Sequence, residues 1–123
     1  MNNKTIKKLH GFNMSQDEAI KLNSKYEHYE KFLNKTIAGE GVLNEVNYLL
    51  LWDKNEIQDL NNAYEVEEFL SGIILIGSDG GDVAYGINVK GEFIEVPFIG
   101  MDDEEVKIVA SDFDQFINYV YNK

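Results

Sequence analysis

Cysteine and arginine are both absent from the 123-residue sequence, and proline occurs only once. Without cysteine the protein can form neither a disulfide nor a thiolate metal site, and this composition is compatible with a reducing compartment. Without arginine it lacks the planar guanidinium group that binds a phosphate through two parallel hydrogen bonds. We therefore expect no nucleic-acid partner.

Long hydrophobic runs are also absent. The longest, at residues 48–52 and 73–76, are far too short to cross a bilayer. Residues 1–11 are polar and basic and lack the apolar segment of a signal peptide. We therefore expect a cytoplasmic protein with no membrane partner. The length fits a single domain over 1–123, in which we expect residues 1–14 to form a loosely packed arm.

Negative charge dominates the sequence, but it is unevenly placed. The formal net charge is -11 at pH 7. Residues 1–35 hold seven of the eleven lysines and carry +3, whereas residues 36–123 carry -14. An acidic surface of this size repels nucleic acid and membranes and attracts a basic protein. The same charge also serves simple solubility, and the sequence leaves both interpretations open.

The centre of the sequence has the pattern of three consecutive strands. Residues 73–76 are aliphatic and bounded by glycines, which is typical of a strand buried on both faces. Residues 83–88 alternate large and small side chains, and residues 92–96 form a third strand. The glycine-rich acidic segment 79–82 has the composition of a tight turn. The pattern predicts an antiparallel meander.

The N-terminal part predicts a long helix. Residues 15–18 have the sequence of a capping box, which favours the start of a helix at this point. Apolar residues then recur at three- and four-residue steps, which predicts one buried stripe, and two glycines end the helix. The stripe consists of Leu22, Tyr26, Tyr29 and Leu33, and the glycines are Gly39 and Gly41.

A strand and two further helices are expected after it. Residues 46–52 read as a strand, and residues 53–56 begin a short helix whose inward face is Ile57, Leu60 and Tyr64. Residues 106–110 fit a helical turn or a strand equally well. Residues 111–114 cap a final helix with an apolar face of Phe113, Phe116, Ile117 and Val120. The predicted class is α+β, a mainly antiparallel sheet packed against N-terminal, middle and C-terminal helices.

Paired carboxylates are the feature of the sequence that comes closest to a catalytic site. Asp79 with Asp82, and Asp102 with Asp103, could in principle share acid and base roles if their surroundings separated their pKa values. Their positions favour turn and helix-cap roles, and segment 79–82 lacks the ligand number of a calcium loop. The two histidines, His10 and His28, have no zinc-site spacing. We therefore predict no catalytic residue, no metal and no cofactor.

Trp52 is the only tryptophan, and two interpretations of it remain open. It ends a predicted strand and precedes Asp53. Core packing is the ordinary role of such a residue. The alternative is a partly exposed aromatic anchor beside acids, as is common in protein interfaces.

The order of these segments resembles the SUKH superfamily, the domain shared with fungal Smi/Knr-type regulators of cell-wall synthesis. The matching pieces are the Tyr-Glu-Lys-Phe-Leu segment 29–33, the strand end and acidic helix 51–64, the turn 77–82 with the following Ala-Tyr, the Val-Pro-Phe segment 96–98, and residues 111–117. Each piece is weak by itself, whereas the ordered set is fairly specific and spans most of the chain.

The resemblance implies a single α+β domain that acts by binding a protein. Small bacterial members of this superfamily are typically immunity proteins that neutralise polymorphic toxins, often nucleases or deaminases, and fungal members are regulatory scaffolds. The first interpretation is an immunity protein with a basic toxin partner, and the second is a regulatory module that binds an endogenous partner. The residues expected on or near the binding surface are Trp52, Asp79, Asp82, Tyr85, Asp102 and Asp103.

Overall fold

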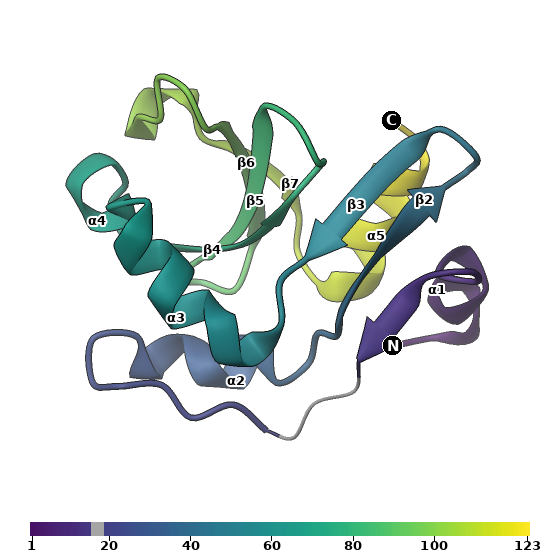
Figure 1. Cartoon of the computed structure of the whole chain (residues 1–123), viewed down its shortest axis with the longest axis horizontal. Coiled ribbons are helices and arrows are strands. Elements are labelled where there is room, and N and C mark those ends of the chain that lie inside the picture. The colour runs from purple at the N-terminus through teal and green to yellow at the C-terminus, as the bar shows by residue number, and fades with distance from the viewer. Residues whose placement is uncertain (16–18) are drawn as a thin grey trace.

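A single antiparallel sheet organises the chain (Figure 1). The computed structural model describes residues 1–15 and 19–123, and within them it forms a seven-stranded sheet whose strands lie in sequence order. The α+β class and the central meander are thereby confirmed. The strands are β1 (Asn13–Ser15), β2 (Ala38–Leu43), β3 (Asn47–Leu51), β4 (Ile73–Ser78), β5 (Val83–Asn88), β6 (Phe93–Pro97) and β7 (Lys107–Ala110).

Helices cover the sheet at different places along its width. The helix α5 packs against β3, β7 and α1, whereas α3 and α4 pack against β4. Figure 1 shows α3 and α4 together at one side of the molecule and α5 beside the β2–β3 hairpin. The helical elements are α1 (Asn3–Lys8), η1 (Glu27–Tyr29), α2 (Glu30–Leu33), α3 (Lys54–Ala63), α4 (Val66–Phe69), η2 (Asp103–Glu105) and α5 (Phe113–Tyr121).

The final helix is confirmed together with its apolar face. The side chain of Asp112 accepts a hydrogen bond from the Gln115 amide at 2.8 Å and so caps the first turn of α5. The four predicted inward residues are all buried. Among them, Phe116 stacks on Phe93 of β6 with ring centroids 4.9 Å apart. This aromatic packing holds α5 on the sheet.

A glycine fixes the junction between β3 and β4. These strands pair at only two positions, Leu50 with Ser78 and Leu51 with Gly77. A Cβ atom on Gly77 would lie 2.0 Å from the carbonyl oxygen of Leu50, so no larger residue fits without a backbone shift. Upstream in β4, the amide and carbonyl of Leu75 are satisfied by the side chain of Asn61 from α3, at 2.8 Å each. A buried side chain thus completes the strand where β3 does not reach.

The predicted long N-terminal helix is wrong over the described residues. Its expected start at residues 16–18 lies outside them, residues 19–23 are neither helix nor strand, and only the short elements η1 and α2 follow. Side chains satisfy the backbone there: the Ile20 amide donates to Asn34 Oδ1 and the Leu22 amide to Glu30 Oε2, both at 2.8 Å. These side-chain hydrogen bonds compete with the backbone hydrogen bonds that a helix would form.

The apolar stripe assigned to that helix still faces the core. Tyr26, Tyr29 and Leu33 are buried, and Leu22 is partly buried against them. The glycines expected to end the helix lie instead within β2. Burial of apolar residues was therefore predicted correctly, whereas the backbone conformation that achieves it was not.

The N-terminal segment differs from the loose arm expected for residues 1–14. It forms α1 and β1, and Leu9 is buried in the core. The Thr5 hydroxyl and the Asn2 amide both donate to Asp114 Oδ1, at 2.6 and 2.9 Å. One apolar side chain and one shared carboxylate therefore dock this segment on α5.

Tyr64 also departs from its predicted position. It was expected on the inward face of the middle helix, but it is the C-cap of α3 and 46% of its surface is exposed. The other two inward residues behave as expected, because Ile57 is buried and Leu60 is partly buried. The ambiguous segment 106–110 is resolved in favour of a strand, β7.

Candidate functional site

The turn between β4 and β5 is built around Asp79. Its Oδ1 atom accepts hydrogen bonds from the amides of Gly81 at 2.8 Å and Val83 at 3.2 Å, and Gly80 has a positive φ of 82°. These bonds hold the turn closed. Asp82 in the same turn is exposed, and its carbonyl oxygen accepts a hydrogen bond from the Phe98 amide at 2.9 Å. Asp82 therefore presents its carboxylate to solvent beside Phe98.

Tyr85 lies in the interior and does not contribute contact area to an outer surface. Its exposed fraction is 0%, and its ring meets Phe116 of α5 edge-on with centroids 5.1 Å apart. The reason is its register on β5, which directs it to the face covered by α5. Its hydroxyl accepts a hydrogen bond from Lys123 Nζ at 3.1 Å.

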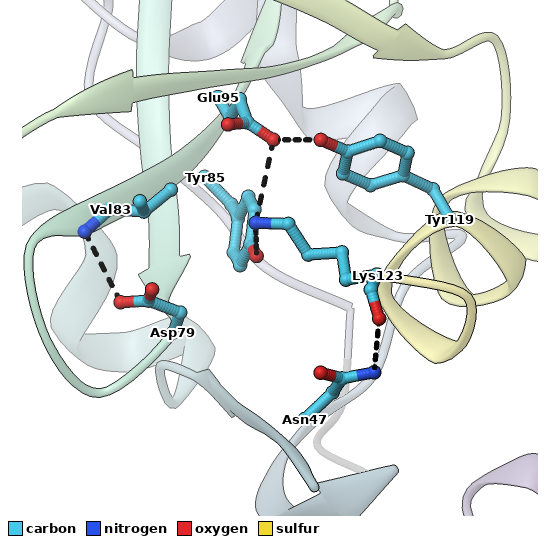
Figure 2. A network of polar contacts seen from close by, with 7 residues as sticks. All are labelled: Asn47, Asp79, Val83, Tyr85, Glu95, Tyr119 and Lys123. Atoms are coloured by element: carbon cyan, nitrogen blue, oxygen red, sulfur yellow. Dashed lines mark hydrogen bonds and ion pairs between the residues drawn. The ribbon is translucent and has the colours of Figure 1, made fainter. Parts of the chain in front are cut away.

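A polar cluster surrounds that ammonium group, and Figure 2 shows how its members converge. The Lys123 Nζ atom lies 3.6 Å from Glu95 Oε1, and the Tyr119 hydroxyl donates to the same carboxylate oxygen. The ammonium also lies 5.3 Å from the ring centroid of Tyr85 and 5.5 Å from that of Tyr119. We call Tyr85, Glu95 and Tyr119 the ammonium cage.

The pKa values of the two cage tyrosines and of the lysine between them are shifted. Burial, together with the hydrogen bond to Glu95, raises the pKa of Tyr119 well above its ordinary value. Burial also raises the pKa of Tyr85, although Lys123 opposes that shift. Burial by itself would lower the pKa of Lys123. The hydrogen bond with the Tyr85 hydroxyl and the negative charges of Glu95 and Asp79 outweigh burial, so the pKa is raised. The tyrosines are therefore neutral and Lys123 is charged at neutral pH.

Sequence reasoning missed Glu95, Tyr119 and Lys123. They come from β6, from α5 and from the chain after α5, so no local spacing connects them. The available signals were weak. Glu95 interrupts an apolar strand, and Lys123 is one of only four lysines in the acidic part of the chain.

Trp52 belongs to the core, and its exposed neighbour is Tyr64. The tryptophan is 9% exposed and stacks on Tyr64 with centroids 6.0 Å apart and planes 10° apart. Tyr64 in turn lies 5.3 Å from the ring of Phe98. The next residue, Ile99, is 86% exposed. This row of side chains leads from the core to the surface, so the anchoring role considered for Trp52 fits Tyr64 better.

Asp102 and Asp103 organise η2. Asp102 caps it by accepting a hydrogen bond from the Glu104 amide at 2.8 Å. Asp103 accepts from both the amide and the hydroxyl of Ser71, each at 2.8 Å, and these bonds lower the pKa of its carboxyl group. Since Ser71 follows α4 closely, this contact ties η2 to the end of α4.

Carboxylates gather where these two elements meet. Exposed acids on and beside α4 and η2 are Glu65, Glu67, Glu68, Asp102, Asp103, Glu104 and Glu105. One of the two ion pairs among the described residues lies here, between Lys25 and Glu67 at 3.0 Å. We call this cluster, with Asp82, Tyr64, Phe98 and Ile99, the acidic–aromatic surface.

The six predicted site residues therefore separate into two groups. Asp82, Asp102 and Asp103 belong to the acidic–aromatic surface, and Trp52 supports it from below through Tyr64. Asp79 and Tyr85 belong to the turn and the cage instead. Within the described ranges, no group of three potential ligands from His, Cys, Asp and Glu is placed to hold a metal ion. The helices described there also include none with the length and hydropathy to cross a bilayer.

Comparison with known proteins identifies one family. Residues 16–119 match the SMI1 / KNR4 family (SUKH-1). The match covers most of the chain, including the meander, the turn at Asp79, η2 and nearly all of α5. A comparison with curated proteins gave no match.

Proposed function

Because the chain belongs to the SMI1 / KNR4 family (SUKH-1), we propose that it is a non-catalytic immunity protein that binds and neutralises a cognate protein toxin. Binding takes place on the acidic–aromatic surface. The protein acts in the cytoplasm, and its partner is a basic toxin domain that attacks nucleic acid. The proposal rests on the family together with the chemistry of this surface.

The observation that carries the proposal is the exposure of Tyr64 and Ile99 among carboxylates. Their exposed fractions of 46% and 86% are high for large apolar side chains, and Tyr64 is held in place by stacking on Trp52 and by a tilted ring contact with Phe98. A rigid aromatic group within a polar rim is the usual anchor of a protein interface. Surrounding carboxylates would steer a basic partner toward it.

A second candidate function follows from the same family. Its fungal Smi/Knr-type members act as regulatory scaffolds, so the acidic–aromatic surface could equally serve an endogenous partner. The two functions differ in the partner and share the surface. The identity of the neighbouring gene separates them, since an adjacent toxin gene favours immunity.

Co-expression tests the immunity function directly. The C-terminal domain encoded by the neighbouring gene is expressed alone and together with this protein, and cell survival and co-purification are scored. We expect toxicity alone, survival together, and a stable complex of the two proteins. Toxicity that persists despite soluble expression of this protein would refute the proposal and favour the regulatory function.

Charge reversal tests the surface. Asp82→Lys with Glu104→Lys changes two exposed carboxylates of the acidic–aromatic surface, and we expect the association rate to fall roughly tenfold and to depend less on salt. The matched control, Glu27→Lys with Glu45→Lys, makes the same change in net charge at η1 and at the β2–β3 turn. Equal effects of the two pairs in stopped-flow binding would mean that only net charge matters and that binding occurs elsewhere.

A further inference from the structure

The Lys123 ammonium occupies a site that resembles those used to bind cationic ligands. The centroids of two tyrosine rings lie 5.3 and 5.5 Å from it, a hydroxyl oxygen lies at 3.1 Å and a carboxylate oxygen at 3.6 Å (Figure 2). Aromatic faces and a nearby carboxylate are the two features that attract an ammonium or guanidinium group. The chain thus fills this cage with its own side chain.

The cage walls are held in place without Lys123. Tyr85 and Glu95 are register partners on the adjacent strands β5 and β6, so their side chains lie next to each other on one face of the sheet. Tyr119 comes from α5 and donates its hydroxyl hydrogen to Glu95. Packing of Tyr85 against Phe116 fixes the buried ring. Such a preorganised site loses little conformational entropy when a ligand enters.

The backbone of the occupant, in contrast, is held by few contacts. Lys123 follows the C-cap of α5, and its backbone makes long hydrogen bonds, 3.3 Å to the Val120 carbonyl and 3.4 Å from Asn47 Nδ2. The Lys123 side chain is 27% exposed and the Glu95 side chain 20% exposed. Rotation of the lysine side chain therefore opens the cage without unwinding α5.

We propose that the ammonium cage is a binding site for a lysine or arginine side chain of the partner, and that Lys123 occupies this site in the free protein. This inference rests on the proposed function for the identity of the partner. When one cation replaces another, the charge inside the cage stays the same, so its balance against Glu95 and Asp79 is kept. The nearby Lys107 ammonium, 5.8 Å from the Tyr119 ring, also meets the same total charge. Asp79, whose charge acts on Lys123, then lies near the entering side chain (Figure 2).

Chemical rescue tests the cage without any partner. In Lys123→Ala the cage loses its cation, and we expect the melting temperature to fall by about 3 °C. Millimolar n-butylammonium, which reproduces the missing lysine side chain, should restore it, whereas n-butanol and equal concentrations of sodium chloride should not. Wild-type protein should show no such rise, because Lys123 already fills the site.

Two variants control this experiment. Lys8→Ala removes an ammonium 5.4 Å from the Tyr121 ring, where no carboxylate ion pair is present among the described residues, and n-butylammonium should not rescue it. Adding Glu95→Gln to Lys123→Ala should abolish rescue while circular dichroism shows an unchanged fold. If n-butylammonium has the same effect on Lys123→Ala, Lys8→Ala and wild type, the cage does not bind ammonium groups and the proposal is overturned.

Binding to the co-purified toxin domain then separates this inference from the proposed function. We expect Lys123→Ala to bind about three- to tenfold more tightly than wild type, because the competing side chain is gone. Glu95→Gln should bind more weakly. Unchanged affinity in both variants would overturn the partner's use of the cage while leaving the immunity function intact. Absence of any complex, with rescue by n-butylammonium preserved, would refute the immunity function and leave the cation site standing.

Discussion

At the scale of single residues, Asn61 shows how one side chain can replace part of a strand. Its amide group donates to the Leu75 carbonyl and accepts from the Leu75 amide, and it also donates to the Ile57 carbonyl, all at 2.8 Å. Asn61 is buried. We predict that Asn61→Ala lowers the free energy of unfolding by about 3 kcal/mol, because it leaves buried backbone groups of Leu75 without partners.

Urea denaturation at neutral pH measures this loss. The matched control is Asn55→Ala, which makes the same change at an exposed position of the same helix. Its effect should stay within about 0.5 kcal/mol. Helix propensity cannot explain a loss in either variant, because alanine favours a helix more than asparagine does. Similar destabilisation by the two variants would mean that the hydrogen bonds to Leu75 are not what makes Asn61 important.

At the scale of elements, the docking of α1 on α5 depends on Asp114. The Thr5 hydroxyl, followed by the Asn2 amide, lowers the pKa of this carboxyl group from its ordinary value of 3.8. Because the pKa is lower in the folded state, the stabilisation is fully present above the unfolded value and is lost as pH falls through the folded value. Acidification through the folded-state pKa of Asp114 should therefore weaken the docking of α1 on α5.

The substitution Thr5→Val tests this contact. Removal of the hydroxyl should raise the Asp114 pKa toward 3.8, as followed by carboxyl-detected NMR titration. Asp103 is the internal control, since its lowered pKa depends on Ser71 and should not move. If the Asp114 pKa is unchanged in Thr5→Val, the hydroxyl does not hold α1 in solution.

At the scale of the whole molecule, negative charge exceeds positive charge, with 22 acidic residues against 11 lysines. The net charge is -11, and the described part of the chain contains two ion pairs, Lys25–Glu67 and Lys123–Glu95. Repulsion between carboxylates therefore outweighs attraction, and salt screens it. We predict that raising sodium chloride from about 0.01 to 0.15 M increases the melting temperature measured by calorimetry. A decrease would show that attractive pairs dominate.

The sequence by itself determined the elements whose signals are local. The meander follows from aliphatic runs and glycine-rich turns, and α5 follows from its apolar period and the cap at Asp112. Burial of Tyr26, Tyr29 and Leu33 also followed from their spacing. These features depend on neighbouring residues, so a periodic pattern is sufficient to predict them.

Only the tertiary structure decided which side chains meet. In the non-helical segment 19–23, the amides of Ile20, Leu22 and Asn23 donate to the side chains of Asn34, Glu30 and Gln58, and no local pattern could reveal these bonds. The C-cap position of Tyr64 exposes it and leaves Trp52 in the core. The ammonium cage joins β5, β6 and α5, so its existence depends on strand register and helix docking, which are set by the packing of the whole core.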